Sequence, residues 1–222
     1  FGEQNITYKC CSNFLIHLLD FIKHNHSDKT ILCEQLFFVH GTYSFQKRLD
    51  KAHTIISSVS KKFHIPLSHI KVSGSAHLGI SLQKGTTFNE KQSDLDLAII
   101  DANLYAEILN QIYKKTNYYK NQSLFNIEET EYQGKTLSMS HFDMYTKWLT
   151  KGVIHPKYFP NIDYKRNWDG FFSELSRNNR GIFKNISACV YLSETSFKNK
   201  QVSSINTALK SLSNSPLEMA SP

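Results

Sequence analysis

The sequence lacks the patterns that identify membrane proteins, disulfide-stabilised proteins and zinc sites. No apolar stretch approaches the roughly 20 residues that a membrane-spanning helix needs. The four cysteines form neither a C-x-x-C pair nor a spaced disulfide framework, and the ten histidines include no H-E-x-x-H sequence. These absences predict a cytoplasmic protein with reduced thiols, without a membrane partner and without a zinc site.

Negative charge is also scarce. Lysine and arginine number 26 against 19 aspartate and glutamate residues, which gives a formal net charge of +7 and an attraction for polyanions such as nucleotides or nucleic acid. The lysines are scattered rather than massed in one run, so the sequence shows no dedicated nucleic-acid-binding arm. A general bias toward lysine and asparagine explains the charge equally well. At 222 residues the chain is long enough to bury a hydrophobic core.

The most informative feature that is present is Asp94-Leu95-Asp96. Residues two apart in a strand face the same way, so the two aspartates share one face while Leu95 turns into the core. Two adjacent carboxylates repel unless a cation lies between them, and Mg²⁺ commonly combines one or two carboxylates with substrate phosphates. Such a pair on a strand edge is more often simply solvated. Here the apolar run 97–100 follows directly, which favours a buried strand over a surface loop.

A Gly-Ser turn precedes the acidic pair. Val72 ends a short apolar strand, and Gly74 and Ser75 follow it. Glycine lets the backbone come close to an anion without a Cβ in the way, and serine offers both an N–H and a hydroxyl. The turn therefore predicts a place where a triphosphate can rest.

The order of expected elements is that of an α/β (α+β) protein. Hydrophobic periodicity predicts helices over 14–22, 49–63 and 101–112, the last with Asp101 as its N-cap. Two strands, 125–132 and 135–145, are expected around a turn at Gln133-Gly134. We expect residues 1–150 to form a core with N-terminal helices and residues 151–222 to be mainly helical, with a disordered tail from about 213.

This arrangement resembles the DNA polymerase β-like nucleotidyltransferase superfamily, over roughly residues 45–150. The residues that match its pattern are Gly74, Ser75, Asp94 and Asp96. Within it the chain looks most like the cyclic GMP-AMP synthases and the bacterial oligonucleotide second-messenger synthases, which implies a role in antiviral defence. The resemblance implies the nucleotidyltransferase fold, a mixed sheet flanked by helices, with nucleoside triphosphates as substrates and Mg²⁺ or Mn²⁺ as the cofactor.

The resemblance also implies a third carboxylate on a strand beside the pair. We place it at Asp143, between the core-facing Phe142 and Met144, with Glu131 and Asp163 as alternatives. Asp94, Asp96 and Asp143 are then expected to hold two Mg²⁺ ions, one on the triphosphate and one that activates an attacking hydroxyl for displacement of pyrophosphate.

The match departs from the superfamily pattern in one place. Residues 76–93 make a longer connection than usual between the turn and the first aspartate, and we expect a polar loop at the mouth of the site. Farther along, Lys198 and Lys200 are candidate phosphate contacts, of which Lys198 is our nucleotide-binding candidate.

Three functions fit the sequence. The first is an oligonucleotide second-messenger synthase. The second is a toxin-like transferase that adds a nucleotide to RNA or to a protein side chain. The third is a catalytically silent domain that binds nucleotide or RNA, against which the intact acidic pair argues.

Overall fold

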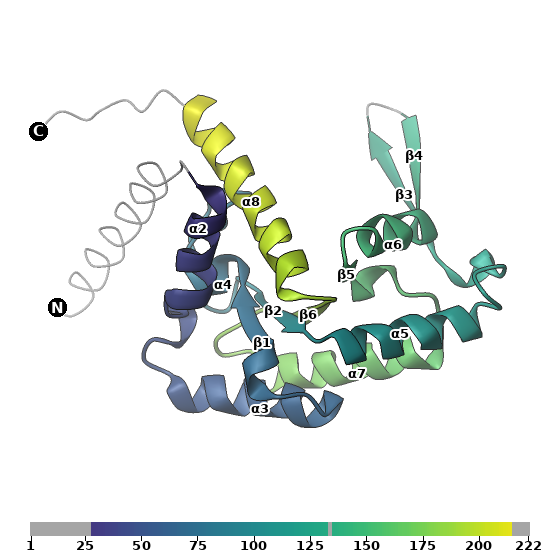
Figure 1. Ribbon diagram of the computed structural model, residues 1–222, viewed down its shortest axis with the longest axis horizontal. Coiled ribbons are helices and arrows are strands. Elements are labelled where there is room, and N and C mark those ends of the chain that lie inside the picture. Colours follow the sequence, from purple (N-terminus) through teal and green to yellow (C-terminus); the bar gives the residue numbers. More distant parts are fainter. Residues whose placement is uncertain (1–27, 133–134, 215–222) are drawn as a thin grey trace, which may run out of the picture.

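The computed structural model describes residues 28–132 and 135–214, and these form a mixed α/β structure (Figure 1). Within these ranges there are seven α-helices, a mixed four-stranded sheet and a small two-stranded antiparallel sheet. The helices are α2 (Lys29–Glu34), α3 (Leu49–Phe63), α4 (Gly74–Leu78), α5 (Ala102–Lys115), α6 (His141–Leu149), α7 (Asp163–Arg177) and α8 (Glu194–Asn214). The strands are β1 (Ile70–Ser73), β2 (Leu95–Ile100), β3 (Ile127–Tyr132), β4 (Lys135–Ser140), β5 (Val153–Ile154) and β6 (Ile186–Tyr191). No helix in the described ranges is long and apolar enough to cross a membrane.

The larger sheet has the strand order β1-β2-β6-β5. Strand β2, which contains Asp96 and begins directly after Asp94, lies between an antiparallel neighbour, β1, and a parallel neighbour, β6. The register sets Ser73 of β1 and Ser187 of β6 on either side of Asp96. The acidic strand is therefore in the interior of the sheet.

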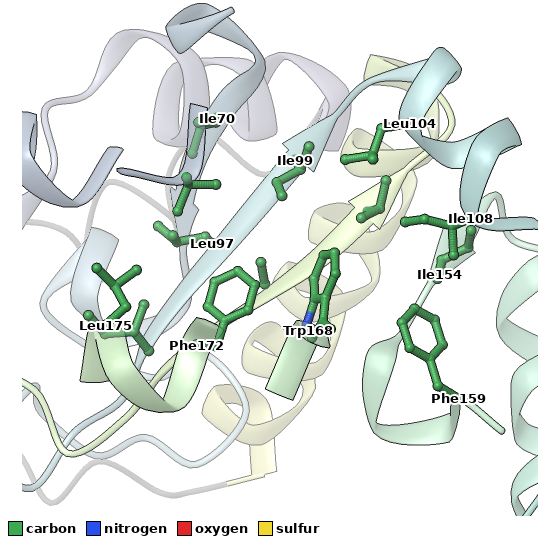
Figure 2. Packing of buried hydrophobic residues seen from close by; sticks show 14 of the residues in the cluster. Ile70, Leu97, Ile99, Leu104, Ile108, Ile154, Phe159, Trp168, Phe172 and Leu175 are labelled. Carbon is green, nitrogen blue, oxygen red and sulfur yellow. The ribbon is translucent and has the colours of Figure 1, made fainter. Parts of the chain in front are cut away.

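Helices cover both faces of this sheet (Figure 1). Leu95, Leu97 and Ile99 alternate onto one face, where they meet the apolar sides of α3, α5 and α7 (Figure 2). The opposite face packs Ala98 and Tyr191 against α2 and α8. Because both faces of the sheet are covered, the sequence of β2 is a continuous apolar run after Asp96.

Several expected elements are confirmed. Helix α3 follows the predicted periodicity, and Asp101 caps α5, its Oδ1 accepting from the N–H of Leu104 at 2.8 Å. A strand does run into the Gly-Ser turn, and the segment expected to be mainly helical does contain two long helices, α7 and α8. The expected helix 14–22, the turn at 133–134 and most of the expected tail lie outside the described residues.

The prediction of a strand through Asp143 is wrong. Strand β4 ends at Ser140, whose hydroxyl accepts a hydrogen bond from the N–H of Asp143 at 3.4 Å and so caps α6. An N-cap serine ends an extended segment because its side chain satisfies an N–H of the first helical turn. Strands β3 and β4 pair only with each other among the described strands and project from the rest of the structure (Figure 1).

The segment expected to be mainly helical contributes two strands to the sheet. Besides α7 and α8 it contains β5 and β6, and β6 pairs with β2 along its whole length. The sequence Ile186–Tyr191 alternates buried and open positions, which is the pattern of a strand. Residues on both sides of position 150 therefore build one sheet.

Loss of side-chain volume should cost stability in the sheet but not in the hairpin. Ile99 is fully buried on β2, whereas Ile127 on β3 is 66% exposed. We expect Ile99→Ala to lower the free energy of unfolding by about 2–5 kcal/mol, because a buried cavity remains. The matched change Ile127→Ala should stay within about 0.5 kcal/mol of the wild type. Denaturant unfolding measures both, and equal effects would contradict this description of the core.

Candidate active site

The two aspartates lie side by side at the start of β2 and open into a cleft. The side-chain amide of Asn185 donates to Asp94 Oδ1 at 3.2 Å, and the hydroxyl of Ser187 donates to Asp96 Oδ1 at 3.2 Å. Within the described ranges, hydrogen bonds thus reach one oxygen of each carboxylate. The other oxygen of each remains available to a ligand.

Gly74 lies directly against Asp96. Its φ is +66°, and a Cβ at this position would lie 2.8 Å from Asp96 Oδ2. Glycine is therefore required twice, by the left-handed backbone and by the close approach. Ser73, immediately before it, donates its hydroxyl to the backbone carbonyl of Asp96 at 3.2 Å. The predicted turn and the predicted acidic pair are thus brought together.

A buried histidine anchors the short helix that begins at the turn. His77 donates from Nε2 to the carbonyl of Leu36 at 2.8 Å and accepts at Nδ1 from the Thr42 hydroxyl at 3.0 Å. Its ring also stacks on Phe37, with centroids 5.4 Å apart. Burial lowers the pKa of His77 from 6.5 to about 4, so the ring is neutral at pH 7. Its role here is to hold α4 in place behind Gly74.

The electrostatics of the pair are those of a crowded carboxylate site. Partial desolvation raises the pKa of Asp96, the hydrogen bond from Ser187 lowers it, and the charge of Asp94 raises it again. Lys84 and Lys200 pull in the other direction from a greater distance. The net shift is upward, so ionisation of Asp96 carries an energetic cost that a nearby cation would lower.

The cleft around the pair has a volume of about 1140 Å³, large enough for a ligand with several charged groups. The connection 76–93, predicted as a loop at the mouth, supplies part of its wall, including Ser81, Lys84 and Gln92. The loop is ordered by its own hydrogen bonds, among them Ser81 N–H to Thr86 O and Phe88 N–H to Gly79 O, both at 2.8 Å. The polar loop therefore contributes directly to the site.

Positive side chains line the same cleft. They come from the loop, from the short turn Pro156–Tyr158 after β5, from the end of α7 and the segment after it, and from α8. The cationic residues are Lys84, Lys157, Arg177, Arg180, Lys184 and Lys200. In the described part of the chain none of them forms an ion pair with Asp94 or Asp96. Most of these cationic residues could not be identified as site residues from the sequence, because the strand that brings them together, β6, was not predicted.

Lys198 and Lys200 separate on the surface of α8. Residues two apart on a helix do not face the same side. Lys198 forms ion pairs with Glu34 at 2.9 Å and Glu194 at 3.2 Å, tying α8 to α2, and it does not line the cleft. Lys200 does line it, with its ammonium 3.3 Å from the Ser204 hydroxyl. The structure thus brings the second lysine to the site instead of the first.

None of the three candidates for a third carboxylate lines the cleft. Asp143 is exposed on α6, Glu131 is exposed on the projecting hairpin, and Asp163 pairs with Arg166 in the first turn of α7. The carboxylate that does line the cleft besides the pair is Asp169, which is ion-paired with Lys165 at 3.0 Å. Among the described residues there is no cluster of three or more metal-ligating side chains. On the parallel neighbour, β6, the residue opposite Asp96 is Ser187.

Comparison of the chain with protein-family models, with curated proteins and with solved structures finds no match. The residues of the cleft are therefore the only indication of its chemistry.

Stability should fall in mildly acid solution because His77 is held neutral. Its pKa lies below the unfolded value, so the unfolded chain takes up a proton first as pH falls, and stability present above pH 6.5 is lost toward pH 4. From pH 7 to pH 5 this group alone should cost about 2 kcal/mol. Denaturant unfolding of His77→Gln should show a correspondingly smaller pH dependence. The exposed His53→Gln is the matched control, and an equal effect of the two changes would contradict the assignment.

Proposed function

We propose that the cleft binds a nucleoside triphosphate with a divalent cation and transfers the nucleotide to a hydroxyl, with release of pyrophosphate. The observation that carries this proposal is the contact of Gly74 with Asp96, which sets a Gly-Ser turn against a carboxylate pair. This is the juxtaposition expected of a DNA polymerase β-like nucleotidyltransferase fold. The cations around the pair suit a polyphosphate.

The carboxylate pair fits Mg²⁺ or Mn²⁺. Both ions take oxygen ligands, and Asp94 and Asp96 each keep one oxygen that no hydrogen bond of the described residues uses. When bound, the ion would neutralise charge on the triphosphate and lower the pKa of a hydroxyl beside it.

The protein groups have separate parts in this proposal. The turn at Gly74 and Ser75 receives phosphate oxygens, since the first N–H groups of a helix have no partner within it. Lys200 contributes positive charge from the opposite wall. Asn185 and Ser187 hold the carboxylates by hydrogen bonds at 3.2 Å, and so preserve their orientation before substrate binds.

One observation favours a second function, nucleotide binding without transfer. The position beside Asp96 on β6 is Ser187, and the predicted third carboxylate, Asp143, lies outside the cleft. A hydroxyl cannot take the place of a carboxylate as a strong metal ligand or base. Transfer would then rest on two carboxylates, whereas binding needs no third one.

The acidic pair should control both metal binding and transfer. Incubation with labelled nucleoside triphosphates and Mg²⁺, with and without RNA, should give a product and pyrophosphate, and Asp94→Asn with Asp96→Asn should abolish both. Mg²⁺ with triphosphate should raise the melting temperature of the wild type through mass action, and not that of the double variant. A metal-dependent rise without any product would favour binding alone. Full activity of the double variant would place the site elsewhere.

The two lysines of α8 should differ in their effects on triphosphate affinity. Lys200→Gln removes a charge from the wall of the cleft, and we expect affinity to fall about tenfold or more, since a hydrogen bond to a charged group is lost. Lys198→Gln removes the ion pairs with Glu34 and Glu194 at the surface, where solvent screens them, and should leave affinity unchanged. Titration calorimetry measures both. Equal losses would show that only the net charge matters, and the reverse order would restore Lys198 as the ligand.

A further inference from the structure

The C-terminal end of α5 lies far from β2, the strand that begins at the acidic pair (Figure 1). A second charged surface lies at this helix end. It consists of Tyr113, Lys114 and Lys115, the last residues of α5, and of Tyr118 and Lys120 in the turn that follows, and we call these five residues the tyrosine-lysine patch. Lys114 and Lys115 point to other sides of the helix than Tyr113 does, so the patch wraps around the helix end. Tyr113 and Tyr118 are 42% and 57% exposed, although tyrosine usually covers more of its ring. All three lysines are exposed. Within the described ranges none of the three forms an ion pair.

The two rings are held next to each other by an unusual turn. Asn117, Tyr118 and Tyr119 have φ values of 50°, 60° and 62°, so three successive residues with side chains adopt the left-handed conformation. Such a conformation is disfavoured and persists only where the surroundings impose it. As a result Tyr118 turns back toward the helix, and its N–H donates to the carbonyl of Tyr113 at 2.7 Å.

The rest of the turn is anchored in the core. Thr116 is fully buried; its hydroxyl donates to the carbonyl of Ile112 at 2.8 Å and accepts from the N–H of Tyr119 at 3.1 Å. Tyr119 itself packs inward, with its hydroxyl 3.4 Å from that of Tyr145. The third tyrosine of the segment therefore serves packing. The other two leave ring surface open, with centroids 5.0 Å apart and the planes inclined by 62°.

We infer that the tyrosine-lysine patch binds a single-stranded polynucleotide, with bases on Tyr113 and Tyr118 and phosphates on Lys114, Lys115 and Lys120. Exposed aromatic rings among positive charges are the means by which proteins bind single strands without sequence preference. A duplex keeps its bases stacked inside and offers the rings nothing. The inference goes beyond the proposed transfer reaction, since the patch lies beyond the other end of β2 from the acidic pair.

The test is binding of a fluorescein-labelled 12-nucleotide oligouridylate, followed by anisotropy in the presence of EDTA so that the cleft contributes no metal-dependent binding. Tyr113→Ala with Tyr118→Ala should weaken binding about 30-fold or more, because each of the two stacked bases that are lost usually contributes about fivefold or more. Tyr113→Phe with Tyr118→Phe should retain it, because the rings remain. Melting temperatures of the variants verify that they are folded.

The lysines are tested by salt dependence. Changing Lys114, Lys115 and Lys120 to Gln should lower the slope of log Kd against log salt by about 2, at roughly 0.7 for each phosphate contact with a single strand. Lys61→Gln with Lys62→Gln is the matched control, since this exposed pair lies at the end of α3 just as Lys114 and Lys115 lie at the end of α5. The control should leave the slope nearly unchanged.

Four results would overturn the inference, the fourth of which comes from the comparison with a duplex. One is binding that the alanine changes leave intact, and another is an equal loss in the Lys61 and Lys62 control, which would reduce the effect to net charge. The third is a patch-dependent affinity for phosphatidylserine vesicles together with none for the oligonucleotide, which would assign the surface to a membrane.

A matched DNA oligonucleotide and an RNA duplex complete the comparison. Similar binding of the DNA and weak binding of the duplex would support stacking on single strands. Binding of the duplex as tight as that of the single strand would contradict it.

Discussion

The close approach of Gly74 to Asp96 is the contact on which the rest of the cleft depends. It requires a residue without a Cβ, a left-handed backbone and an antiparallel β1–β2 register that sets Ser73 opposite the carboxylate. Helix α4 then begins where β1 ends, and the buried His77 keeps that helix against the segment at Leu36. Any slip of the register by one residue would turn Asp96 into the core and Leu95 toward the solvent. The core and the candidate site are thus specified by the same pairing.

The parallel strand β6 completes this arrangement from far along the chain. Its residues pair with β2 across some ninety positions, as in Ser187 with Asp96, and the segment before it brings Arg177, Arg180 and Lys184 to the same edge. Parallel pairing needs a long crossover, and here the crossover includes α5, the hairpin, α6 and α7. The cationic wall of the cleft therefore follows from the topology of the sheet, since nothing in the local sequence places these residues near the acidic pair.

What could be predicted from the sequence was local. The strand before Gly74, the acidic strand with its buried leucines, the helix over 49–63 and the cap at Asp101 each depend on neighbouring residues, and each is confirmed. The assignments that failed depended on where an element ends or on what it pairs with. The apolar alternation around Asp143 fits a strand as well as the first turn of a helix, and the hydroxyl of Ser140 decides for the helix. The strand β6 was missed because Ile186–Tyr191 is short and lies between helices.

The charges of the cleft support a ligand that is itself part cation and part polyanion. Two carboxylates lie together without a described lysine or arginine in ion-pair contact, and burial, with a smaller contribution from the charge of Asp94, raises the pKa of Asp96. Positive side chains line the same space, yet the structure pairs them with other partners or leaves them at the wall. The proposed triphosphate with its divalent cation would satisfy the carboxylates and the positive side chains at once, because the metal would lie on the carboxylates and the phosphates would lie toward the turn and Lys200.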